Sequence, residues 1–294
     1  MALKDIFSLN VVPIKEDASV EGKQIRNISV QGSSMDVNVL PSDKDNIDIK
    51  LRGEVSERVK DHFNLQVKQV NDFLSVEMER KKFSAPFGVI VVRLTLDLFI
   101  PKKIYESLLV KTSSGEIELH LVKSKNIELK TSSGDIRVKD IEETEAIKLS
   151  ASSGDMILTG GQARFTQLET SSGDIIMRKF GGSQLEASSS SGKIDICGYQ
   201  GNLHVESSSG DINLLYDELT GHLKAKTSSG SVKLSYQIEP SSFNLDFKGS
   251  SGEADIHVKG IEYEKNTDHV VLGTKGAGDY SLQVRTSSGD FLMQ

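Results

Sequence analysis

Apolar residues recur at fixed positions around a repeated Ser-Ser-Gly triplet. One apolar residue precedes the triplet and another stands seven positions later, as in the pairs Val110 with Ile117 and Leu129 with Ile136. A straight strand keeps one face at even steps, so an odd step needs a corner or bulge that shifts the face by one residue. The pattern predicts two short strands that meet at each triplet and bury their apolar side chains.

The triplets follow one another at nearly constant intervals. Nine triplets are separated by gaps of 18 to 22 residues, except for a last gap of 37. The usual gap is too short for a repeat that contains a helix, and the intervening residues show no helical periodicity. We predict an all-β fold, a single elongated β-solenoid similar to a parallel β-helix, with about 19 residues per coil. The triplets end at Gly115, Gly134, Gly154, Gly173, Gly192, Gly210, Gly230, Gly252 and Gly289.

The residue types in the triplet indicate a structural turn. Glycine either adopts a backbone conformation that is closed to other residues or lets a neighbouring turn approach closely. Serine hydroxyls are expected to bond the amides that a corner leaves without partners in the strand ladder. We therefore interpret the nine glycines as structural corner residues in units that stack about 4.8 Å apart.

The first third of the chain is less regular than the rest. We predict an irregular β cap over residues 1–105 and the regular solenoid over residues 106–294. The cap includes one divergent repeat, ISVQGSSMDVNV at residues 28–39, in which Val30 and Val37 keep the spacing of seven. Such a cap is needed because an open end would expose unpaired ladder groups and apolar surface.

Two further segments have patterns that predict their structure. Residues 87–101 alternate apolar and polar positions and contain Arg93 and Asp97, which indicates a half-buried strand and not a membrane helix. The segment near residues 260–280 interrupts the repeat and is expected to form a loop or hairpin.

Composition narrows the class of protein. The chain has 294 residues, and its formal net charge of −7 argues against a nucleic-acid partner. No stretch approaches about 18 uncharged apolar residues, and the N-terminus lacks the apolar run of a signal peptide. We therefore expect no transmembrane segment and a cytoplasmic location, with association to the cell envelope through a partner. The single cysteine, Cys197, excludes an internal disulfide and a cysteine-rich zinc site.

The segment LTLDLFIPKKIYESLLVKTSSGEIEL at residues 94–119, followed by serial SSGD copies, resembles a bacterial family of unknown function labelled "putative adhesin". That family includes the LiaG-type proteins of Gram-positive envelope-stress operons. The resemblance implies a repetitive β-solenoid without established catalytic residues and with a link to the cell envelope. The name "adhesin" rests on shape, and shape does not determine function.

A column of mostly acidic residues follows the glycines. Its members are Glu116, Asp135, Asp155, Asp174, Lys193, Asp211, Ser231, Glu253 and Asp290. One alternative is a calcium site whose ligands are Asp135, Asp155 and Asp174, because calcium prefers carboxylate oxygens. The favoured interpretation is structural: each aspartate bonds the serine amides of its own corner. Lys193 is expected to attract Asp174 and Asp211 and so relieve their repulsion. No metal or cofactor site is predicted.

The sequence favours a protein without catalysis. Six histidines lie at different positions of the repeat, and HExxH, GxSxG and phosphate-loop motifs are absent. We expect a non-catalytic, adhesin-like scaffold or interaction protein that binds a protein or envelope component, as a monomer or with weak end-to-end association. The alternative is a carbohydrate-acting solenoid enzyme that draws on the acidic column, although the chain has no tryptophan. Ice binding would need a Thr-x-Thr alternation that the corners do not show.

Overall fold

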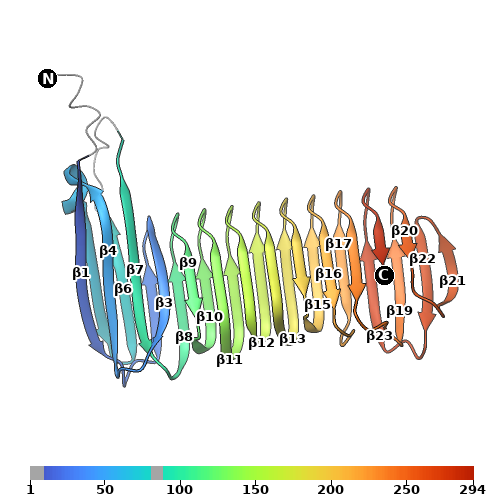
Figure 1. Cartoon of the computed structure of the whole chain (residues 1–294), viewed down its shortest axis with the longest axis horizontal. Helices are drawn as coiled ribbons and strands as arrows, with labels where there is room; N and C mark the ends of the chain where they lie inside the picture. The colour runs from blue at the N-terminus through green and yellow to red at the C-terminus, as the bar shows by residue number, and fades with distance from the viewer. Residues whose placement is uncertain (1–9, 81–88) are drawn as a thin grey trace.

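The structure is a computed structural model that describes residues 10–80 and 89–294. The described residues form β-strands and one 3₁₀ helix, η2 (Glu57–His62). The 24 strands of these two ranges belong to one hydrogen-bonded sheet that is mostly parallel. The molecule is an elongated stack, with the N-terminal strands at one end and β21 at the other (Figure 1). The first residues of the strand predicted at 87–101 lie outside the described residues, and β7 begins at Val92.

The strands have the following bounds in chain order. They are β1 (Val11–Glu21), β2 (Asn27–Gln31), β3 (Met35–Ser42), β4 (Asn46–Ser56), β5 (Phe63–Val70), β6 (Phe73–Arg80), β7 (Val92–Pro101), β8 (Ile104–Lys111), β9 (Ile117–His120), β10 (Lys123–Lys130), β11 (Ile136–Ser150), β12 (Met156–Thr170), β13 (Ile175–Ser189), β14 (Ile194–Cys197), β15 (Gln200–Ser207), β16 (Ile212–Tyr216), β17 (Leu223–Thr227), β18 (Val232–Tyr236), β19 (Phe243–Lys248), β20 (Ala254–Ile256), β21 (Glu262–Thr267), β22 (Val270–Lys275), β23 (Tyr280–Arg285) and β24 (Phe291–Met293).

Each repeat unit contributes one strand to each of two parallel rows. The leading row holds the strands that enter the Ser-Ser-Gly turns, such as β8 and β10, and the trailing row holds the strands that leave them, such as β9. The long strands β11, β12 and β13 begin in the trailing row and continue into the leading row of the next unit. Paired residues are alike, as with Leu129 opposite Leu149 and Ile136 opposite Met156.

The core runs along the stack between the two rows. Alternate residues of most strands are buried, as in β17, where Leu223, Ala225 and Thr227 point inward and the two lysines between them are exposed. The buried residues form one continuous apolar cluster from Ile25 to Met293. This alternation is what the period of two along a strand requires when one face is buried.

The spatial order of the units differs from the chain order at both ends. Strand β2 lies between β6 and β8, so the first unit is not at the end of the stack. At the other end β23 lies between β17 and β19, and β24 lies between β18 and β20. The last unit therefore occupies the space between two units that precede it in the chain. This placement accounts for the last gap of 37 residues between triplets.

Antiparallel strands cover both ends of the stack. Strands β1, β4 and β7 form one antiparallel group at the N-terminal end, and β22 and β21 continue antiparallel from β19 at the other end. The outer strand β1 carries Pro13 and several charges, and every residue of β21 is exposed, among them Glu262, Glu264 and Lys265. Proline and charges on an edge strand discourage pairing with another molecule. The predicted boundary between residues 105 and 106 falls inside β8 and stays a prediction.

Candidate functional site

The Ser-Ser-Gly turns stack directly on one another. A Cβ added to Gly134 would lie 1.9 Å from the Gly115 carbonyl oxygen, and one added to Gly154 would lie 1.7 Å from that of Gly134. None of the nine triplet glycines has a positive φ. Of the two roles considered for them, close approach of the neighbouring turn is therefore the one that the geometry requires. The triplet glycines form one stack. In it, Gly115 lies against the Met35 carbonyl, Gly289 against the Gly230 carbonyl, and Gly252 against the Gly289 carbonyl.

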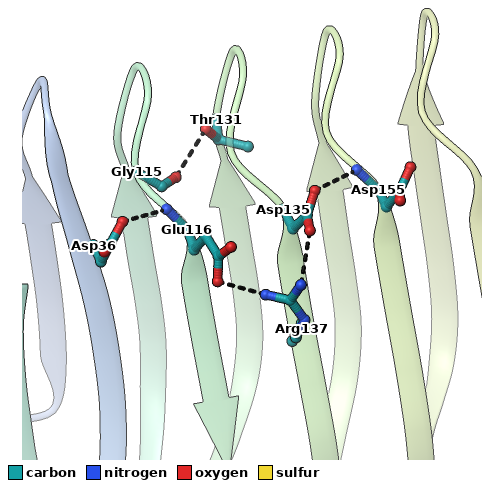
Figure 2. Close-up of polar contacts among 7 residues, drawn as sticks. All are labelled: Asp36, Gly115, Glu116, Thr131, Asp135, Arg137 and Asp155. Carbon is teal, nitrogen blue, oxygen red and sulfur yellow. Dashed lines mark hydrogen bonds and ion pairs between the residues drawn. The ribbon is translucent and has the colours of Figure 1, made fainter.

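In five of the nine units, a buried hydroxyl one residue before the triplet holds the turn to its neighbour. The Thr131 hydroxyl donates to the Gly115 carbonyl at 3.2 Å and accepts the Gly134 N–H at 3.1 Å. Figure 2 shows the first of these bonds. The same two kinds of bond are made by Thr112, Thr170, Ser189 and Thr227. These hydroxyls therefore satisfy groups that would otherwise be buried without partners.

The role predicted for the serine hydroxyls is wrong. The amides of Ser132 and Ser133 both donate to the Ser113 carbonyl of the neighbouring unit. The serine side chains of the nine triplets are exposed, and in residues 10–80 and 89–294 their hydroxyls have no hydrogen-bond partner. The amide that needs a hydroxyl is that of glycine, and the preceding threonine reaches it from inside. We call the exposed serine pairs of the nine triplets the serine ridge.

The acidic column bonds from one unit to the next. The Asp135 carboxylate accepts the backbone N–H of Asp155 at 3.0 Å, and Asp155 in turn accepts that of Asp174 at 2.8 Å. Asp36 accepts the N–H of Glu116 at 2.9 Å in the same way (Figure 2). The expectation that each aspartate bonds the serine amides of its own corner is therefore wrong. The acceptor lies one unit away because the turn amides of the same unit already donate to backbone carbonyls.

Charge in the column is balanced by a residue that the sequence reasoning missed. Arg137 contacts the carboxylates of Glu116 at 2.5 Å and Asp135 at 2.8 Å (Figure 2). The Lys193 ammonium, expected to attract Asp174 and Asp211, contacts Asp195 at 3.5 Å. An arginine two residues beyond the column points back along its strand, and this i to i+2 spacing is the signal that would have found it.

The calcium alternative would need several acidic side chains that converge on one point. Within the two described ranges, no group of three or more His, Cys, Asp and Glu side chains is arranged to hold a metal ion. One oxygen each of Asp135, Asp155 and Asp174 already accepts a backbone amide.

The opposite turns, which connect the trailing strand of one unit to the leading strand of the next, follow another rule. At the start of this turn, each of five successive units places a residue in the left-handed region, with φ between 52° and 69°. These residues are Leu121, Asp140, Gly160, Lys179 and Gly198. Side chains other than glycine are costly at positive φ. The mixture of residue types hid this column from sequence reasoning.

Several titratable groups outside the turns are paired or buried. His204 contacts Glu206 at 3.0 Å on the outer face of the leading row, and this hydrogen bond lowers the pKa of Glu206. Two buried tyrosine hydroxyls, Tyr199 and Tyr216, have no hydrogen-bond partner in the part of the chain that the structure describes. Burial raises the pKa of both phenols, so they stay neutral at physiological pH.

A groove of about 600 Å³ crosses the outer face of the leading row between β8 and β13. Its hollow lies at Ala146, which pairs with Asn126 on one side and with Phe165 on the other. The Phe165 side chain is 45% exposed. The groove is lined further by Glu128, Lys148, Gln184 and Glu186.

Comparison with solved structures shows the same fold in proteins of very different sequence. A "putative adhesin" from Parabacteroides distasonis is 16% identical over 96% of this chain and 97% of its own, with a TM-score of 0.56. A "putative lipid binding protein" from the same species is 16% identical over 95% of this chain and 96% of its own, with a TM-score of 0.51. A "putative adhesin" from Parabacteroides merdae is 14% identical over the same shares, with a TM-score of 0.50. At these identities the likeness concerns the fold alone.

Two comparisons of the sequence complete the picture. Residues 25–293 match the family model described as Toastrack DUF4097. The comparison with curated proteins finds no related sequence. Within the described ranges, no helix has the length and apolar character to cross a membrane.

Proposed function

The chain belongs to the Toastrack DUF4097 family, and from this premise we propose that it is a non-catalytic, adhesin-like scaffold or interaction protein. Its architecture in this proposal is a β-solenoid with about 19 residues per coil. The strand register supports that period, since Leu149 lies opposite Leu168 and Leu168 lies opposite Ala187. Two rows joined by regular turns provide a long, stiff body with a repeated surface.

One observation carries the proposal: the residues that recur along the repeat are used to hold the units together. The threonine hydroxyls, the glycine contacts and the column carboxylates all bond to neighbouring units. What the repeat leaves for solvent is the serine ridge and the outer faces of the strands. A surface repeated over many units suits contact spread along the body more than reaction at one point.

The enzyme alternative is less well supported by the groove. Its carboxylates Glu128 and Glu186 stand on β10 and β13, which are three strand spacings apart. At about 4.8 Å per spacing their backbones are roughly 14 Å apart. Paired acids that cleave glycosides lie about 5 to 9.5 Å apart. The groove therefore favours binding over cleavage.

We propose a protein or a cell-envelope component as the partner, with the chain acting as a monomer. Two proteins of the same fold, named "putative adhesin" and "putative lipid binding protein", motivate this choice. The charged edge strands β1 and β21 disfavour end-to-end association. A link to envelope stress stays a prediction.

Complementation in the native organism tests the absence of catalysis. We expect that His204→Ala, Asp155→Asn and Glu186→Gln, each expressed and folded like the wild type, restore the phenotype of a deletion strain. Contact spread over a surface tolerates the loss of one side chain, whereas catalysis does not. One such variant with native melting behaviour and abolished function would overturn the proposal.

A further inference from the structure

The groove over β8 to β13 combines an exposed ring with polar side chains of both signs. We propose that it binds an uncharged oligosaccharide, an inference that rests on the non-catalytic role proposed above. A volume of about 600 Å³ falls within the range of small-molecule sites. The ligand would lie across the strands, with Ala146 forming the floor beneath it.

The floor of the groove exists because one residue in a row of outward-pointing side chains is small. The register aligns Ser107, Asn126, Ala146, Phe165 and Gln184 on adjacent strands. Ala146 has no side chain beyond Cβ, so the larger neighbours Asn126 and Phe165 form the two walls. A hollow of this kind is a local departure from the repeat, since the other outward columns keep longer side chains at this point, such as Glu128, Lys148 and Gln167.

Phe165 offers an apolar platform at the edge of the hollow. It is among the few large apolar side chains that are more than a third exposed. The guanidinium of Arg164 lies 5.0 Å from its ring centre, which orients the ring and supplies hydrogen-bond donors beside it. An aromatic ring next to polar groups suits a sugar, which presents C–H groups on one face and hydroxyls around its edge.

The surrounding polar groups are available for hydroxyls. Asn126 donates its amide N–H to the Glu106 carbonyl, which fixes the side chain and leaves its oxygen free to accept. Gln184 donates to Glu186 at 2.7 Å, which holds that carboxylate beside the groove. Lys148 makes no ion pair within the described residues. The hollow is therefore lined by both donors and acceptors. Sugar hydroxyl groups need both, because each can donate and accept a hydrogen bond.

Other ligands fit this surface less well. Glu128 is paired with Lys111 at 3.3 Å, and Lys148 and Glu186 carry opposite charges, so the groove has no excess of positive charge that would select a polyanion. One recurring way for an extended peptide to bind is to add a strand to a free sheet edge. β11 and β12 are hydrogen-bonded on both sides here, so the groove has no such edge.

Two variants of the full chain test the inference. Ala146→Trp fills the hollow and Phe165→Ala removes the platform; both positions point outward, so the core is left intact. Leu215→Ala, at an exposed apolar residue of the trailing row, is the matched control. The probes are the tetrasaccharides of β-1,4-linked glucose, β-1,4-linked N-acetylglucosamine and α-1,4-linked glucose, with tetragalacturonate as the anionic contrast. Binding is measured by calorimetry and by NMR of the probe.

We expect at least one neutral tetrasaccharide to bind, and both groove variants to weaken it at least tenfold while Leu215→Ala leaves it unchanged. No binding of any neutral probe at millimolar concentration, or equal binding by Ala146→Trp, would overturn the inference and leave the scaffold proposal standing. Cleavage of a bound probe, followed by product analysis, would overturn the scaffold proposal instead. Preference for tetragalacturonate would also contradict the choice of an uncharged ligand.

Discussion

The Ser-Ser-Gly turns and the opposite turns stack the same units but tolerate different residues. At the triplet turns a carbonyl of one unit lies where a side chain of the next would begin, and glycine recurs. At the opposite turns the left-handed position accepts Leu121, Asp140 and Lys179 as well as glycine. This difference shows that the residues repeated in this chain are those at which the backbones of neighbouring units touch. A strained φ costs about 1 to 2 kcal/mol and is tolerated, whereas overlap with a backbone oxygen is not.

The largest effect is expected at Gly154. Gly154→Ala should lower the free energy of unfolding by about 3 kcal/mol or more, because the new Cβ would overlap the Gly134 carbonyl and the backbone must shift. Gly181→Ala is the control, since its Cβ would meet nothing within 4 Å, and it should change stability by less than about 0.5 kcal/mol. Urea unfolding measures both. Equal losses at the two sites would contradict the contact argument.

The buried hydroxyl of the triplet turn comes next. Thr131→Val keeps the shape but leaves the Gly115 carbonyl and the Gly134 amide without their partner, which should cost about 1 to 3 kcal/mol. The chain contains a natural counterpart, because Ala151 stands at the same position of another unit. Ala151→Thr should therefore stabilise the protein by about 1 kcal/mol. A valine variant as stable as the wild type would show that these bonds are not needed.

At the opposite turn, one substitution is expected to raise the stability of the protein. Lys179→Gly should raise the free energy of unfolding by about 0.5 to 1 kcal/mol, because relief of the positive φ exceeds the entropy that glycine adds to the unfolded chain. Lys233→Gly, on strand β18, should instead lose about 0.5 to 1 kcal/mol. Thermal melting of both variants checks the sign, and a loss at Lys179 would sink the strain argument.

The smallest effect concerns the outer face, away from both turns. The hydrogen bond from His204 lowers the folded pKa of Glu206 below its usual 4.5. Its contribution to stability is therefore present above about pH 4.5 and is lost as the pH falls through the folded pKa. Glu206→Gln should reduce the drop in melting temperature between pH 6 and pH 3 slightly. A variant with an unchanged or larger drop would argue against this pair.

The sequence predicted the parts of the fold that depend on local spacing. The step of seven around each triplet indicated a turn between two inward-facing strands, and Leu129 and Ile136 are both buried. The position of the last unit could not be predicted, because a gap of 37 residues fits an insertion between earlier units as well as a simple extension. Only the pairing of β23 with β17 and β19 decides between them.

The candidate site was predicted in part. The motif SSGD is compatible with an aspartate that accepts a hydrogen bond from an amide of its own turn or from one of the next turn. A short side chain can reach either amide. The choice depends on stacking, which brings the Asp155 amide to Asp135. The groove at Ala146 had no sequence signal, because its walls Asn126 and Phe165 come from different units and align only through the register.

The account rests on the column carboxylates acting as acceptors for the neighbouring unit, and two substitutions at Asp155 test this directly. Asparagine keeps the acceptor oxygen without the charge, so Asp155→Asn should melt like the wild type, whereas Asp155→Ala should lose about 1 kcal/mol. None of the three proteins should respond to calcium beyond the effect of matched monovalent salt. A calcium-specific rise in the melting temperature of the wild type that Asp155→Asn abolishes would contradict the account and make the column a metal site.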